Sequence, residues 1–119
     1  MPTTLRLTRI LMRASITILL VLGLLFWAGQ ALSLLPVHMA VGLIFVLGLW
    51  TLAYLAARAG APAALTASAA VLGLAVLALG GMQTQLLPGP QHWIVRLVHL
   101  LLGLGAMGLA ERLGRAPKA

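Results

Sequence analysis

Two of the three histidines in this chain stand four positions before a glycine, each inside a long apolar segment. They are His38, followed by Gly42, and His99, followed by Gly103. Residues four apart share a face of a helix, so each imidazole would have bare backbone one turn away. A flat macrocycle held between helices needs an axial imidazole and a neighbour too small to collide with the ring. The spacing therefore predicts a haem bound through these two histidines.

The segments that carry the histidines are typical of membrane spans. Hydrophobic residues make up 62% of the 119 positions and charged residues 8%, which is too little polar material for the surface of a soluble domain. Four apolar runs are long enough to cross a bilayer, and the short connections between them force neighbouring helices to run antiparallel. We therefore expect an all-α, integral membrane, four-helix up-down bundle that uses residues 1–119 as a single domain. The expected spans are 14–35, 37–57, 63–87 and 93–110.

Basic residues collect on one side of this topology. They precede the first span, lie between the second and third spans, and follow the fourth, whereas the two remaining connections carry no charge. The positive-inside rule then places both termini in the cytoplasm and the protein in the cytoplasmic (inner) membrane. The basic residues on this side are Arg6, Arg9, Arg13, Arg58, Arg112, Arg115 and Lys118.

Composition also excludes several classes of function. The chain has no cysteine, which rules out disulfides, thiolate metal sites and cysteine-ligated iron–sulfur clusters. No nucleophile, base and orienting acid can be assembled, so the protein is not a hydrolase. The net charge of +7 does not indicate a nucleic acid partner, because the charges flank spans and lack a patch of base-stacking aromatics.

In this topology all three histidines lie on the outer side of the membrane. His38 begins the second span, whereas His92 and His99 lie in the outer half of the fourth. Arg96 stands between those two on nearly the same helix face. An arginine inside a span is costly and needs an anion, and a haem propionate would provide a bidentate, charge-assisted partner. The long side chain of Arg96 also allows a simpler alternative, in which its guanidinium reaches the outer lipid headgroups.

His92 has a separate interpretation. It lies beside Trp93 and next to the outer connection, so we expect an interfacial residue. It is also the alternative axial ligand to His99. If the second and fourth helices begin at the same depth in the bilayer, His99 lies about 10 Å deeper than His38, and His92 would then be level with His38.

The third expected span is unusually rich in small residues. Small side chains let helix backbones approach closely, which predicts that this span is the centre of packing in the bundle. The residues are Ala63, Ala64, Ala67, Ser68, Ala69, Ala70, Gly73, Ala75, Ala78, Gly80 and Gly81.

This arrangement resembles one haem b-binding half of a haem A synthase and, more loosely, other b-type cytochrome membrane bundles. The resemblance rests on the general layout of four helices and on His38, Gly42, His99 and Gly103; around the second histidine the chain reads Val95-Arg96-Leu97-Val98-His99-Leu100. It implies a b-type haem bound through the two histidines. Haem A synthases have two such halves, an outer glutamate and often a cysteine pair. This chain has one half, no outer glutamate and no cysteine, so we do not expect it to hydroxylate a haem methyl.

The resulting hypothesis is a small b-type haem protein that exchanges electrons on the outer side. Its expected partners are a membrane quinol or a periplasmic redox protein, either alone or within a larger redox complex, and a quinol-linked enzymatic role stays open. Gln83 and Gln85 end the third span on the histidine side, where they would line a quinone pocket or simply lie at the interface.

Two alternatives remain. One is a structural or accessory membrane subunit without a cofactor, in which the histidines only bridge helices. The other is a copper or zinc site on the outer side. Its ligands would come from His38, Met39, Met82, His92 and His99.

Overall fold

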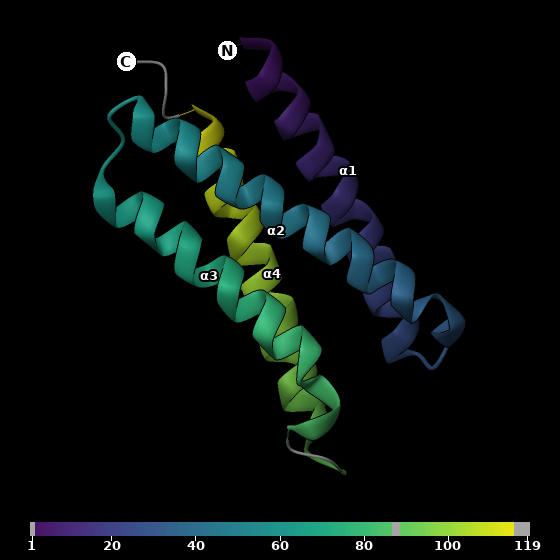
Figure 1. Cartoon of the computed structure of the whole chain (residues 1–119). Coiled ribbons are helices and arrows are strands. Elements are labelled where there is room, and N and C mark those ends of the chain that lie inside the picture. Colours follow the sequence, from purple (N-terminus) through teal and green to yellow (C-terminus); the bar gives the residue numbers. More distant parts are fainter. Residues whose placement is uncertain (1, 87–88, 116–119) are drawn as a thin grey trace.

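The fold is an all-α, four-helix up-down membrane bundle, as predicted. The computed structural model describes residues 2–86 and 89–115. All four helices are long and apolar enough to cross a membrane, and successive helices run in opposite directions (Figure 1). The helices are α1 (Pro2–Trp27), α2 (Leu35–Arg58), α3 (Ala63–Gly81) and α4 (His92–Arg115), with short 3-10 turns η1 (Leu32–Leu34) and η2 (Gln83–Gln85).

Glycines in the left-handed conformation end the first two helices. Gly29 has φ +78° after α1, and Gly60 has φ +91° after α2. In each case the next residue donates its N–H to the carbonyl five positions earlier, at 2.7 Å for Gln30 and 2.9 Å for Ala61. This pattern satisfies carbonyls that the helix end leaves without partners and reverses the chain.

The first two helix boundaries differ from those expected. The first span was expected to reach residue 35, but α1 ends at Trp27. Apolar residues continue through the turn, so hydropathy could not show where the helix stops. Pro36, expected in the outer turn, instead lies in the first turn of α2, where a missing N–H costs no hydrogen bond.

The last two helices also depart from the expected spans. Helix α3 ends at Gly81, before the expected limit of the third span, and η2 follows it. That limit, Leu87, lies outside the described residues. Helix α4 starts at His92 and continues past residue 110 to Arg115, since hydrogen bonding carries a helix beyond the apolar run.

The packing centre is α2 rather than α3, which corrects the expectation from small residues. Helix α2 contacts all three other helices and buries seven residues, whereas α3 buries only Ala69 and Gly73 in the described chain. Small side chains allow close approach, but burial depends on how many neighbours surround a helix. The small residues of α3 that face outward are Ala63, Ala64, Ala67, Ser68, Ala70, Ala78 and Gly81.

The two ends of the bundle are packed differently. The start of α1, the end of α4 and the α2–α3 connection lie at one end, which we call the basic end, and the two hairpins α1–α2 and α3–α4 diverge toward the opposite, histidine end (Figure 1). The buried cluster lies in the half of the bundle nearer the basic end. Its members are Met12, Phe45, Val46, Leu49, Leu52, Ala53, Ala56, Ala69, Ala106, Ala110 and Leu113.

Polar side chains join α1 to α4 at the basic end. Arg13 donates from Nε to Oε2 and from Nη2 to Oε1 of Glu111, both at 2.9 Å. Nη2 of Arg9 lies 3.7 Å from Oε1 of the same carboxylate. Glu111 is the one acidic side chain in the sequence. The bidentate geometry therefore fixes α1 against α4 and uses the chain's entire complement of acidic side chains.

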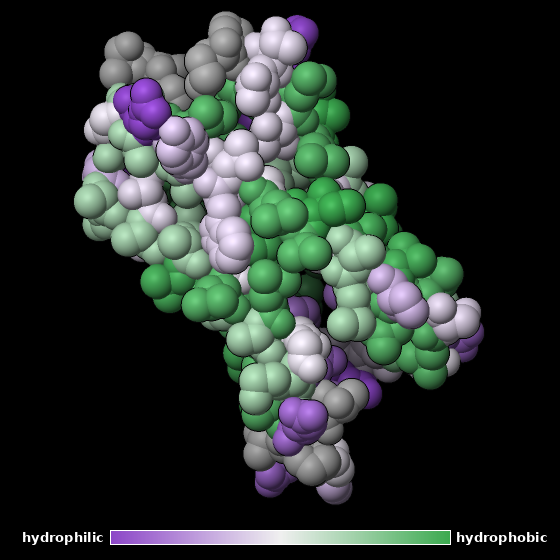
Figure 2. Space-filling view, viewed as in Figure 1, coloured by the Kyte–Doolittle hydropathy of each residue, from purple (hydrophilic) through white to green (hydrophobic). Residues whose placement is uncertain are grey.

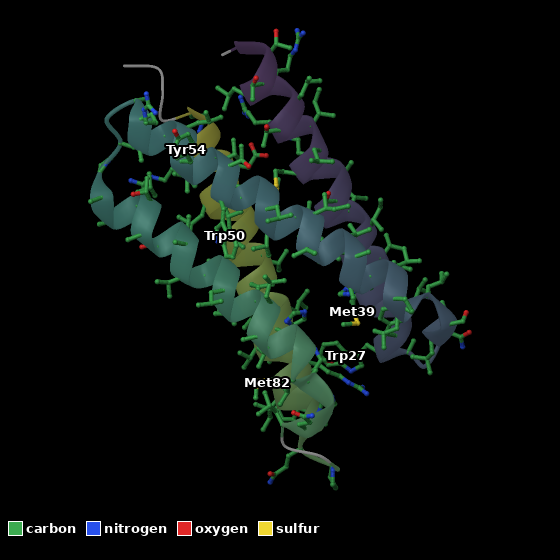
Figure 3. All side chains as sticks on the ribbon, in the orientation of Figure 1. Trp27, Met39, Trp50, Tyr54 and Met82 are labelled. Carbon is green, nitrogen blue, oxygen red and sulfur yellow. The ribbon has the colours of Figure 1, made fainter. Side chains whose placement is uncertain are left out.

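Trp50 marks the closest approach of α2 and α3. Its indole Nε1 donates to the carbonyl of Ala70 at 3.3 Å, so the side chain reaches from one helix to the other (Figure 3). A Cβ added at Gly73 would lie 2.5 Å from that nitrogen and 3.1 Å from Cγ1 of Val46. Only glycine at this position lets the indole lie across α3.

We expect Gly73→Ala to lower the free energy of unfolding by about 1–3 kcal/mol, because the added methyl displaces the rigid indole. The matched control is Gly108→Ala, since a Cβ at Gly108 would meet nothing within 4 Å. That control should leave stability unchanged or slightly raised. Thermal unfolding followed by circular dichroism in mild detergent measures both, and equal melting temperatures would contradict the packing of Trp50 on Gly73.

Candidate functional site

His38 packs within the α1–α2 hairpin at the histidine end. It lies in the first turns of α2 and is half-buried. Its Nε2 lies against α1, 3.7 Å from where a Cβ would stand at Gly23. The imidazole is also tilted by 59° against the ring of Phe26, with the ring centroids 5.4 Å apart. Two residues of α1 therefore position this imidazole.

His99 packs in the same way within the α3–α4 hairpin. Its half-buried ring lies over Gly80 of α3, where an added Cβ would be 3.1 Å from Cε1 and 3.7 Å from Nε2. Its Nδ1 is buried and has no hydrogen-bond partner in the part of the chain that the structure describes. An unsatisfied buried nitrogen costs about 1–3 kcal/mol, and no contact among the described residues offsets this cost at His99.

Each histidine thus rests on a glycine of the preceding helix, and the sequence did not connect either Gly23 or Gly80 with a histidine. The four-residue spacing drew attention to Gly42 and Gly103 on the histidines' own helices. A Cβ at Gly42 would be 3.8 Å from Leu19, whereas one at Gly103 would meet nothing within 4 Å. The position of these glycines along their helices was a usable signal, because Gly23 and Gly80 lie toward the same end of the bundle as the histidines and face them once the hairpins fold.

His38 and His99 belong to different hairpins, and both lie at the histidine end of the bundle (Figure 1). The space-filling view shows a hollow between the diverging hairpins, with hydrophilic residues visible inside an apolar rim (Figure 2). Two imidazoles supplied by two helices are the ligand set that a six-coordinate haem takes from a membrane bundle.

His92 is held by the connecting segment. Its Nδ1 donates to the carbonyl of Leu86 at 3.1 Å, which links the start of α4 to the residues after η2. This contact fits the expected interfacial residue and leaves Nε2 for any further contact. Its alternative role as an axial ligand stays a prediction.

Arg96 is half-buried on α4, three positions before His99. It forms no hydrogen bond or ion pair with the residues that the structure describes. The one acidic side chain, Glu111, is held by Arg13 at the opposite end of the bundle. No described residue therefore offsets the charge of the Arg96 guanidinium.

The copper or zinc alternative gains no support from the geometry. Within residues 2–86 and 89–115, no three His, Cys, Asp or Glu side chains gather closely enough to hold a metal ion. Met39 and Met82 are 56% and 47% exposed and lie on different hairpins, apart from each other (Figure 3). A metal site would have to recruit these two thioethers from the lipid-facing surface.

No family model matches this chain, and no curated protein and no solved structure matches it either.

We expect Gly80→Leu to displace the ring of His99, because even a Cβ at this position is in tight contact with Cε1. The variant should lose about 1–3 kcal/mol of stability through overpacking and should react faster with diethyl pyrocarbonate at His99. Gly81→Leu is the matched control, since a Cβ at the adjacent Gly81 would meet nothing within 4 Å. Equal modification of His99 in the two variants, read by peptide mass spectrometry, would contradict this packing.

Proposed function

We propose that this protein is a small membrane protein that binds one b-type haem through His38 and His99. The observation that carries the proposal is the pair itself. Two half-buried imidazoles from different hairpins lie at the same open end of the bundle, each against a glycine of the preceding helix. One of them has a buried nitrogen without a partner among the described residues.

The residues present fit such a group. Imidazole is a common axial ligand of haem iron, and the divergence of the hairpins leaves a hollow between apolar walls (Figure 2). Gly23 and Gly80 leave room for the imidazole rings on their own hairpins, and Gly103 adds a bare backbone position on α4. A bound haem would supply one-electron redox chemistry, with its potential set by axial ligation and burial.

Arg96 is the proposed partner of a haem propionate. It stands about one helical turn from His99, which is close enough for both to contact one ligand. A guanidinium makes bidentate, charge-assisted hydrogen bonds to a carboxylate, and its charge would offset that of a propionate inside the span. The same contact would satisfy an arginine that has no partner among the described residues.

The placement of the histidines supports a role in electron exchange on one side of the membrane. All three lie at the histidine end, and the opposite half of the bundle has none. One haem there would exchange electrons with a quinol or a periplasmic redox protein, and the chain would act alone or within a larger redox complex. Gln83 and Gln85 lie on η2 at the same end, where a quinol could reach them.

We further propose that the basic end faces the cytoplasm of an inner membrane. The start of α1, the end of α4 and the α2–α3 connection lie at the same end of the bundle, and six described arginines belong to these segments (Figure 1). The positive-inside rule relates such an excess to the cytoplasmic side.

Cysteine labelling tests this orientation, because the chain has no cysteine of its own. In spheroplasts, a membrane-impermeant maleimide should label Gln30→Cys, an exposed position in the α1–α2 connection. Thr3→Cys, exposed near the N-terminus, should react only after permeabilisation. The reverse pattern would contradict the proposed orientation.

We expect the protein, purified in mild detergent after haem-sufficient expression, to show a sharp α-band on dithionite reduction and about one haem per chain. His38→Ala and His99→Ala should each abolish the band, because each removes a ligand to the iron. Arg96→Gln should keep the band but lose haem faster to apomyoglobin, since only the propionate contact is gone.

His92→Ala is the matched control, because it removes a third histidine from the same end and should retain the haem. Loss of the band in His92→Ala with retention in His99→Ala would replace His99 by His92 as the ligand. A featureless spectrum would overturn the haem proposal. Metal analysis would then separate the copper or zinc alternative from a subunit without a cofactor.

A further inference from the structure

A cavity of about 520 Å³ lies at the basic end, on the opposite side of the bundle from the histidines. Its lining residues come from the α2–α3 connection, the first turn of α3 and the last turns of α4, which lie at the same end of the bundle (Figure 1). One wall consists of backbone and small side chains, and the other carries two arginines. The lining residues are Ala59, Gly60, Ala61, Pro62, Leu65, Arg112 and Arg115.

The two arginines have no anion within the described chain. Neither Arg112 nor Arg115 forms an ion pair or hydrogen bond with a described residue. Both carboxylate oxygens of Glu111 accept hydrogen bonds from Arg13. Glu111 is the only acidic side chain in the sequence and acts on Arg115 only at a distance, so no described side chain pairs with either arginine of this cavity.

The wall formed by the α2–α3 connection is also electropositive. It includes Pro62, the residue that precedes α3, and α3 begins there with no side-chain cap and no acid in its first turn. The N-terminal end of a helix carries a partial positive charge, which adds to the charge of the arginines. Leu65 supplies an apolar surface on the same wall, of the kind that a glycerol backbone or the first acyl carbons would cover.

A second cavity of about 410 Å³ adjoins the first and shares Ala59 with it. It is lined by Tyr54, Leu55 and Arg58, and Arg58 donates from Nη1 to the hydroxyl of Tyr54 at 2.9 Å. A tyrosine and an arginine in contact are typical of the level at which lipid headgroups lie. The first cavity is therefore placed at headgroup depth in either orientation of the bundle.

We propose that the cavity between the α2–α3 connection and α4 binds the phosphate of an anionic phospholipid headgroup through Arg112 and Arg115. A guanidinium group can donate two parallel hydrogen bonds to the oxygens of one phosphate. Basic pockets between membrane helices are known sites for anionic headgroups. This site is independent of the haem proposal, since it lies at the other end of the molecule and uses none of the same residues.

Native mass spectrometry of the whole chain in detergent tests the site by titration with phosphatidylglycerol and, separately, phosphatidylcholine. We expect one phosphatidylglycerol to bind in clear preference to phosphatidylcholine. Arg112→Gln and Arg115→Gln should each weaken that binding about fivefold, the effect of one basic residue at a membrane surface. Arg112→Lys should weaken it less, because it keeps the charge but loses the paired hydrogen bonds.

Arg6→Gln is the matched control, since Arg6 is exposed at the same end and lines neither cavity. It should change binding by less than about twofold. Equal weakening in Arg6→Gln, or equal binding of phosphatidylcholine, would overturn the proposed site and leave only a diffuse surface charge. Melting temperatures of all variants, measured without added lipid, show whether each remains folded.

Inorganic phosphate separates a lipid from a free anion. If the lipid is the ligand, millimolar phosphate should leave phosphatidylglycerol bound. If phosphate alone binds and shows the same loss in Arg112→Gln and Arg115→Gln, while the lipid shows no preference, the ligand is a free anion and the lipid assignment is wrong.

Discussion

The packing of α2 against the other three helices is the constraint on which the rest of the structure depends. Its buried side chains, among them Phe45, Leu49 and Leu52, close the bundle from its middle to the basic end. Toward the other end the core stops, and the two hairpins separate (Figure 1). Side chains there cannot all be satisfied by their own chain. That is where His38 and His99 lie half-buried, with one imidazole nitrogen lacking a partner in the described structure.

Scarcity of negative charge is the second feature that shapes the molecule. The carboxylate of Glu111 holds α1 against α4 through Arg13, with Arg9 close by. Once it is engaged, no acidic side chain remains for the other arginines. A charge inside a membrane span is costly, and basic residues at a membrane surface attract anionic headgroups, which is the basis of both proposals made above. At the histidine end this argument applies to Arg96, and at the basic end it applies to the arginines of the cavity.

Glycine positions determine how closely the helices approach. Gly73 accepts the indole of Trp50, and Gly114 lies under Arg9, where an added Cβ would be 2.8 Å from Cδ. Gly23 and Gly80 accept the two imidazoles in the same manner. The absence of a side chain therefore serves two purposes here. Near the basic end it tightens the bundle, and at the histidine end it gives each histidine a fixed place on its own hairpin.

The sequence by itself determined the class of fold and the end of the molecule at which the histidines gather. Apolar length, short connections and the distribution of arginines depend on transfer free energy and chain reach, which are local properties. Only the tertiary structure decided that α2 is the packing centre, that α1 ends at Trp27, and that the glycines beside the imidazoles are Gly23 and Gly80. The pairing of Arg13 with Glu111 and the cavity beside Arg112 also belong to it. These features join residues far apart in the chain, and apolar periodicity does not show which helix faces meet when every face is apolar.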